Sequence, residues 1–285
     1  ALVSDLIVKL RPLLLPAGLN ITGLLLLLGL ATAADAPRRS GDDLLTGPQV
    51  PLDANWVGRR RERQGVGILL LAGHADSQGI EGAGTSGAAV DRRGAKPMDP
   101  RMRDELFWNR KIRDALVRQG QARALNISGY EPNALTILDE NDPRTNWSVG
   151  RRHHDAGGYA LEIHFDAYGP DGYGSGLIPS LRREPSRIDE SLALNFGRYP
   201  LQFRGGLGAP RRGISILEIG KLEGNLEARL RDPSSQDAVI EALAHRIIEA
   251  LEQGLNAPPP SLSSQLDGGG SDPRGKDLQT SPEDG

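Results

Sequence analysis

Three ionisable side chains of this sequence stand at the ends of apolar segments that are typical of buried strands. His74 follows the first segment, His164 lies near the end of the second, and Glu218 lies near the end of the third. A charge buried at such a place must be paired or bound to a metal ion. Taken singly, each has a structural alternative, because a histidine can satisfy local hydrogen bonds and a glutamate can pair with an arginine. The pair His153 and His154 is expected to lie on the surface.

A fourth candidate, Glu105, lies on a helix predicted over residues 103–119. Steps of three and four residues join it to Trp108, Ile112 and Leu116, so the four side chains share one helical face. The apolar members should face a sheet, which puts Glu105 at the N-terminal end of a buried stripe, where the helix dipole favours a carboxylate. The alternative is an exposed glutamate in the first turn. If the side chain points inward, it needs a cation.

These residue types are those of a zinc site. The sequence has no cysteine, so histidine, aspartate or glutamate must hold any metal. Two histidines and one glutamate, with water as the fourth ligand, form a common catalytic zinc set. Zinc lowers the pKa of its water toward ~7 and polarises a carbonyl group. We therefore expect one zinc ion per chain, bound by His74, Glu105 and His164, with Glu218 as the carboxylate that moves the proton.

The elements that must position these residues alternate between strand-like and helix-like segments. Short apolar runs predict buried strands, and longer segments with a helical period predict helices. Starts that resemble capping boxes, at Ser186 and Ser234, open two of the helices. The alternation indicates an α/β fold with a largely parallel sheet, in which ligands bind outside the carboxyl ends of the strands. The expected strands are 67–72, 159–165 and 214–219, and the expected helices are 103–119, 186–198 and 234–253.

Composition divides the 285 residues into four parts. Residues 1–36 join a basic flank, an apolar run and a small-residue exit, which is typical of an export signal; an uncleaved membrane anchor is the alternative. Residues 37–63 are expected to be a linker, residues 64–256 the catalytic domain, and residues 257–285 a disordered tail that is too polar to bury a core. An exported protein of the periplasm or cell envelope follows. The net charge of -3, without a basic stripe, argues against nucleic acid as a partner.

A glycine-rich stretch, residues 79–87, formally contains the pattern GxGxxG from Gly82 to Gly87. A dinucleotide site needs that pattern to open a helix directly after a strand. Here the first strand ends near Ala72, and residues 90–100 contain a glycine and two prolines, so no helix is expected there. The stretch is interpreted as a flexible loop at the rim of the active site.

The motifs together resemble those of the zinc-dependent N-acetylmuramoyl-L-alanine amidases, the cell-wall hydrolases of the amidase-3 family. The Gly-His at 73–74, between an apolar strand and a glycine-rich loop, is similar to the start of that family. Glu105 opens a helix with Asn109 four residues on, as in the family's second motif. The family's Ser-x-His-x-Asn-Ala resembles Glu-Ile-His-Phe-Asp-Ala at 162–167. Its apolar pair before Glu-x-Gly resembles Ile-Leu-Glu-Ile-Gly at 216–220.

This resemblance implies that His74, Glu105 and His164 bind zinc and that Glu218 is catalytic. It implies a single α/β domain with a twisted, mostly parallel central sheet and helices on both faces. The implied reaction is hydrolysis of the amide between N-acetylmuramic acid and L-alanine of peptidoglycan, or of a muropeptide fragment, which agrees with an exported chain. The alternatives are a zinc peptidase or carboxypeptidase-like hydrolase of another amide, and a non-catalytic wall-binding domain on the same fold.

Three acidic residues depart from the family pattern. Glu162 stands in place of the usual serine, Asp166 in place of the usual asparagine, and Asp76 near the usual second glycine after Gly-His. Glu162 shares a strand face with His164, because side chains two residues apart point the same way. It could therefore bind the metal, orient a metal ligand or contact solvent, and Asp76 has the same alternatives.

Overall fold

The computed structural model describes residues 40–43, 45–52 and 58–257. The expected export signal or anchor, residues 1–36, and the tail from residue 258 onward lie outside the described residues. Within the described ranges, none of the helices combines the length and the apolar character that crossing a membrane requires.

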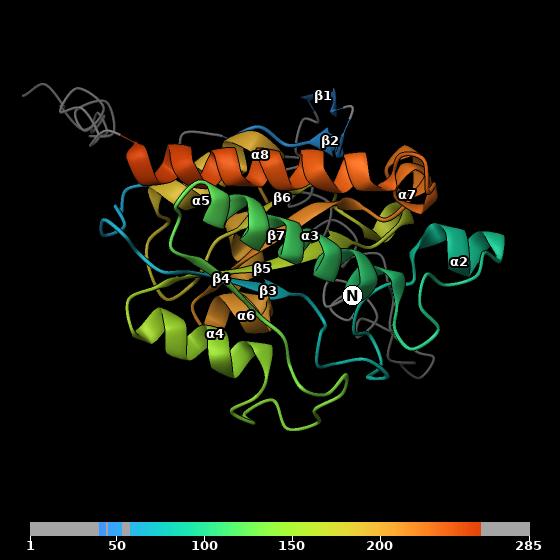
Figure 1. Ribbon diagram of the computed structural model, residues 1–285, viewed down its shortest axis with the longest axis horizontal. Coiled ribbons are helices and arrows are strands. Elements are labelled where there is room, and N and C mark those ends of the chain that lie inside the picture. Colours follow the sequence, from blue (N-terminus) through green and yellow to red (C-terminus); the bar gives the residue numbers. More distant parts are fainter. Residues whose placement is uncertain (1–39, 44, 53–57, 258–285) are drawn as a thin grey trace, which may run out of the picture.

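A five-stranded sheet forms the centre of the domain (Figure 1). Its strands, in spatial order, are β4 (Ile127–Tyr130), β3 (Ile68–Ala72), β5 (Tyr159–Asp166), β7 (Ile214–Lys221) and β6 (Gly176–Ile178). The first four run parallel, and β6 runs antiparallel to β7. The three strands expected from the sequence are confirmed as β3, β5 and β7. The other two are too short to give a clear apolar pattern.

Helices cover both faces of the sheet, which confirms the expected α/β architecture (Figure 1). One face carries α3 (Asp104–Ala122), α5 (Arg187–Phe196) and α8 (Gln236–Asn256), and the other carries α4 (Asn146–Asp155) and α6 (Gly208–Arg211). The remaining elements are β1 (Ser40–Asp43), β2 (Gly47–Gln49), α2 (Gly87–Arg93), α7 (Gly224–Arg231) and two short 3-10 turns, Gly169–Asp171 and Leu201–Gly206.

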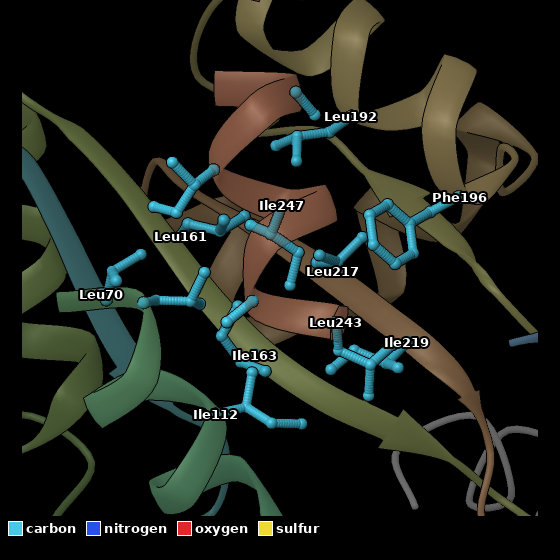
Figure 2. Close-up of a cluster of buried hydrophobic side chains, with 14 of the residues drawn as sticks. Leu70, Ile112, Leu161, Ile163, Leu192, Phe196, Leu217, Ile219, Leu243 and Ile247 are labelled. Atoms are coloured by element: carbon cyan, nitrogen blue, oxygen red, sulfur yellow. The ribbon is translucent and has the colours of Figure 1, made fainter. Parts of the chain in front are cut away.

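Alternating strand side chains divide the core into two layers, as the period of two predicts. Leu70 and Ile163 join Ile247 in the larger layer, between the sheet and helices α3, α5 and α8 (Figure 2). Leu71 and Ile216 belong to the smaller layer, under α4 and α6. The even-numbered side chains of β5 and β7 therefore point to the α4 side, and that is the side from which the candidate residues of these strands emerge.

The two expected capping boxes have different outcomes. At the start of α5 the box is present: Ser186 Oγ accepts from Asp189 N, and the Asp189 carboxylate accepts from Ser186 N. The box expected at Ser234 is wrong. Ser234 Oγ donates to the Asp232 carboxylate instead, and α8 begins at Gln236 without a side-chain cap. A local acceptor two residues upstream thus competes successfully for the serine hydroxyl.

Part of the segment expected to be a linker packs against the domain. Strands β1 and β2 form a small antiparallel pair. Val50, just after this pair, is buried, and Leu45 and Leu52 pack against the larger core layer. Further along, Arg59 N donates to Pro185 O ahead of α5. These contacts attach residues on both sides of the undescribed gap 53–57 to the sheet and its helices.

Candidate metal centre and active site

The three expected metal ligands converge at the carboxyl ends of β3 and β5. One nitrogen or oxygen atom from each of His74, Glu105 and His164 lies within 4.8 Å of the other two. Glu105 Oε1 lies 3.5 Å from His74 Nε2 and 3.2 Å from His164 Nδ1. The two imidazole rings meet edge to face, with centroids 4.8 Å apart. Glu105 is 1% exposed, so the inward orientation of its helical face is confirmed.

The turn after β3 presents His74 through an unusual backbone conformation. Its φ of 63° lies in the left-handed region, which a residue with a Cβ rarely adopts and which is found preferentially at functional sites. The preceding Gly73 is required for space, since a Cβ there would lie 2.5 Å from His164 Nε2. Asn109 Nδ2 on α3 donates to Gly73 O at 3.2 Å. The turn after β3 therefore packs closely against helix α3 and the ring of His164.

Glu105 is oriented by the glycine-rich loop. Its Oε2 accepts from Thr85 N at 2.8 Å, and its own backbone N donates to Thr85 O at 3.1 Å. The Arg103 guanidinium donates to the carbonyl oxygens of Ala83 and Gly84 in the same loop. The loop thus leaves Oε1 of the glutamate directed at the two histidines.

The expectation that no helix follows the glycine-rich stretch is wrong, because α2 begins at Gly87 and ends at a left-handed Gly94. Its first N–H groups already have protein acceptors. Ala88 N donates to Leu222 O, and Ala89 N donates to the Glu227 carboxylate at 2.8 Å. A phosphate bound at a helix N-terminus needs such N–H groups, so the structure provides a reason of its own against a nucleotide site.

Glu218 lies beside the three expected ligands. It is the register partner of His164 across β5 and β7. Burial raises the pKa of Glu218 to about 8, although the adjacent His164 opposes the shift. One buried atom at this point, Glu218 Oε2, makes no hydrogen bond within the described residues, and His164 Nε2 faces the Glu162 carboxylate at 3.3 Å. Buried polar atoms are rarely left unpaired, and those that are commonly face a ligand or an ion.

The electrostatics of the three side chains suit a cation. Burial lowers the pKa of His74 to about 4, which keeps its imidazole in the neutral, metal-binding form at neutral pH. For Glu105, burial acts upward, but the two histidines outweigh it and lower its pKa to about 2. For His164, burial acts downward, but Glu105 and Glu162 raise its pKa well above the ordinary value. A positive charge is therefore favoured between these carboxylates, and a metal ion would compete with a proton for it.

A cavity of about 310 Å³ opens onto this group and is lined by both histidines. Its apolar wall includes Ile80 and Trp147. Four carboxylate residues also contribute to the lining, and none of the described lining residues is a lysine or an arginine. The four are Asp76, Glu81, Glu140 and Glu162.

The acidic residues that depart from the family pattern occupy different positions. Glu162 is 2% exposed, so the interpretation that it contacts solvent is wrong. Asp76 Oδ2 accepts from Asn146 N at 2.6 Å, and burial raises the pKa of Asp76 to about 6. Asp166 accepts from Gly174 N at 2.7 Å and from Tyr199 OH at 2.6 Å. Asp166 therefore organises the chain after β5 rather than the site.

The expectation that His153 and His154 both lie on the surface is wrong for His154. That residue is 5% exposed and packs against Gly213, just before β7. Burial lowers its pKa to about 4. His153 is partly buried, with Nε2 at 2.8 Å from Gly67 O, at the start of β3. Both lie at the amino ends of the strands, away from the candidate metal ligands.

Two residues near the site are missing from the sequence-based set. Ser77 Oγ lies 3.3 Å from His74 Nδ1. Asn146 Nδ2 donates to Ala72 O at 2.6 Å and to Glu162 Oε1 at 3.3 Å. The only local signal for Asn146 is its place after a threonine that caps α4.

Neither a protein-family model nor a curated protein matches this sequence. Among solved structures, the chain is similar to the catalytic domain of the CD27L endolysin targeting Clostridia difficile, with 15% identity, a TM-score of 0.42, and coverage of 66% of this chain and 97% of that chain. It is also similar to the CwlD amidase from Clostridioides difficile in complex with the GerS lipoprotein, with 16% identity, a TM-score of 0.42, and coverage of 67% and 100%.

A third similar structure is the catalytic domain of CwlV, an N-acetylmuramoyl-L-alanine amidase from Bacillus (Paenibacillus) polymyxa var. colistinus. The identity is 15%, the TM-score 0.40, and the coverage 65% of this chain and 98% of that chain. Identities and TM-scores are low in all three comparisons. The function therefore has to be inferred from the side chains of this chain.

Proposed function

We propose that this chain is an exported, zinc-dependent N-acetylmuramoyl-L-alanine amidase that cleaves the amide between N-acetylmuramic acid and L-alanine in peptidoglycan or its muropeptide fragments. The observation that carries the proposal is the convergence of His74, Glu105 and His164, with Glu218 beside them on the neighbouring strand. The motif order around these four residues resembles that of the amidase-3 family and supports the choice of bond.

The donor set fits zinc in its chemistry. Two imidazoles and one carboxylate leave a coordination position for water or substrate, as catalytic zinc sites do. The unpaired Oε2 of Glu218 agrees with a site made for a ligand that is not part of the chain. When bound, zinc would polarise the amide carbonyl and acidify the attacking water.

Glu218 moves the proton in the proposed reaction. Water adds to the amide carbon with loss of a proton to Glu218, and the same proton passes to the nitrogen as the carbon–nitrogen bond breaks. The products, after the carboxyl proton also passes to the amine, are a lactyl carboxylate and a peptide with a free ammonium group. A carboxylate with a raised pKa is suited to both halves of this transfer. The cavity lined by Ile80, Trp147 and Glu162 accommodates the peptide or sugar on either side of the bond.

The test is a digest of purified peptidoglycan with the zinc-loaded full chain, followed by labelling of new amines and mass analysis. The amidase releases intact stem peptides with free L-alanine N-termini. Shortened stem peptides would identify a peptidase of the carboxypeptidase type instead. Binding to the wall without any cleavage would point to a non-catalytic wall-binding domain.

The matched control is Glu218→Gln, which keeps the shape of the side chain and removes its base. Turnover should fall by ~10²–10⁴-fold, the usual contribution of a general acid–base residue. Metal analysis should still find zinc near one per chain, because Glu218 is outside the ligand group. Retained turnover in this variant would remove Glu218 from the mechanism, and folded wild-type protein that binds no zinc would overturn the proposal.

A further inference from the structure

The ring of His164 lies between two carboxylates. Its Nδ1 is 3.2 Å from Glu105 Oε1, on the side where the expected metal ligands converge. Its other nitrogen, Nε2, is 3.3 Å from Glu162 Oε2. The group of metal-competent atoms includes Glu105 but not Glu162. The two glutamates therefore have different relations to the same histidine.

The position of Glu162 is fixed by its surroundings. It precedes His164 by two residues on β5, so the two side chains emerge from the same face. Its Oε1 accepts from Asn146 Nδ2 at 3.3 Å, and this amide also donates to Ala72 O at the end of β3. In the described part of the chain, no lysine or arginine pairs with Glu162, which is 2% exposed. A carboxylate buried in this way needs N–H donors, and the available ones are Asn146 and His164.

We propose that Glu162 is a positioning residue for the metal site: it holds the His164 ring with the proton on Nε2 and leaves the lone pair of Nδ1 for the metal. This inference rests on the metal site of the proposed function. A neutral imidazole has one N–H group, and a carboxylate can only accept, so a carboxylate beside Nε2 selects the tautomer with the proton there. Metal-binding histidines generally donate their outer N–H to such a partner, which orients the ring.

The arrangement makes glutamine an informative replacement. Both groups that face Glu162, the Asn146 amide and the His164 Nε2–H, are donors. Glutamine offers one acceptor oxygen and one NH₂ group, so it can satisfy only one of the two donors. With the NH₂ group toward the ring, the other tautomer is favoured, and its Nδ1 carries a proton instead of a free lone pair. Aspartate keeps two acceptors at a longer reach and serves as the conservative variant.

The experiment measures the zinc dissociation constant of the full chain by competition with a chromophoric chelator. Glu162→Gln should bind zinc ~10–100-fold more weakly than wild type, the usual effect of losing such a partner. Glu162→Asp should recover part of the loss. The matched control is Asp189→Asn, the same change at a buried carboxylate beside the start of β7, which should leave the zinc affinity unchanged.

Nitrogen NMR of the histidine rings gives a readout that a merely structural role would not move. In zinc-loaded wild type, His164 should show a metal-bound Nδ1 and a protonated Nε2, and in Glu162→Gln the protonated Nε2 signal should weaken. The inference is overturned if Glu162→Gln keeps the wild-type affinity and ring pattern, or if His164 binds zinc through Nε2. Wild type that binds zinc but does not cleave peptidoglycan would overturn the proposed function alone, whereas wild type that binds no zinc would overturn both.

Discussion

Buried carboxylates lie at both ends of strands β5 and β7, but the two ends differ in how many hydrogen-bond donors surround them. At the amino end, Asp189 is 2% exposed and fully supplied with donors. Its Oδ1 accepts from Tyr159 OH at 2.9 Å and Ser215 Oγ at 2.8 Å, and its Oδ2 accepts from both N and Oγ of Ser186. Each donor belongs to the start of a strand or helix, so this network ties three elements together.

At the carboxyl end, the carboxylates have fewer donors. Glu218 Oε2 is buried without a hydrogen bond within the described residues, and Glu162 faces one amide, from Asn146, and one imidazole, from His164. A satisfied polar network can stabilise a fold, whereas an incompletely satisfied one has a cost unless a ligand completes it. Burial of a charged group therefore does not by itself mark a functional site. The balance of hydrogen-bond donors and acceptors around that group is the better indicator.

The largest effect on stability is expected at the amino end. Asp189→Ala leaves the N–H of Ser186 and the hydroxyls of Tyr159 and Ser215 without their common acceptor. The free energy of unfolding should fall by ~2–4 kcal/mol, measured by urea denaturation. Zinc affinity of the folded protein should not change. If the variant and wild type were equally stable, the amino-end network would not stabilise the fold, and the contrast between the two ends would be wrong.

A smaller effect, on both stability and zinc binding, is expected at Gly73. In Gly73→Ala, the new Cβ would lie 2.5 Å from Nε2 and 2.6 Å from Nδ1 of His164. The ring must shift, so we expect a loss of ~1–3 kcal/mol in the free energy of unfolding, as for overpacked sites, together with weaker zinc binding. Gly205→Ala is the control, since a Cβ there meets nothing within 4 Å. Unaltered zinc affinity in Gly73→Ala would show that the ring position is not critical.

A modest effect is expected at Ser77, whose hydroxyl faces His74 Nδ1 at 3.3 Å. This neutral partner is the counterpart of Glu162 at the other histidine. Ser77→Ala should weaken zinc binding by a factor of roughly 2–10, because a neutral hydrogen bond contributes ~0.5–1.5 kcal/mol. Chelator competition under the conditions used for Glu162→Gln measures the difference. A larger loss for Ser77→Ala than for Glu162→Gln would reverse the ranking of the two partners.

The smallest effect concerns the pH dependence of stability and is expected at His154, at the amino end. Its folded pKa of about 4 lies below the unfolded value of ~6.5, so the unfolded state binds more protons between these values. Its contribution to stability is complete above pH ~6.5 and is lost as the pH falls toward 4. His154→Gln should therefore show a shallower loss of stability over this window than wild type. Parallel curves in urea unfolding at several pH values would contradict the assignment.

From the sequence alone, three of the five strands of the central sheet, the helical face that Glu105 shares with Trp108, and the four candidate residues could be predicted. Apolar runs give β3, β5 and β7 their positions, and steps of three and four residues place Glu105 on one face of α3 with Trp108; the structure shows that this face is buried. These features depend on periodicity and on residues close in the chain, which is why the sequence reveals them.

Which groups face each ring nitrogen depends on the tertiary structure. Ser77 and Glu162 contact the two histidines, and Asn146 holds Glu162, through distances that depend on the turn after β3 and the approach of α4. The burial of His154 depends likewise on the loop before β7. Local patterns report which side chains share a face of a helix or strand, but donors and acceptors from distant segments meet only when strand register and helix docking are fixed. For that reason, the sequence indicates a metal site, and the structure indicates how its ligands are held.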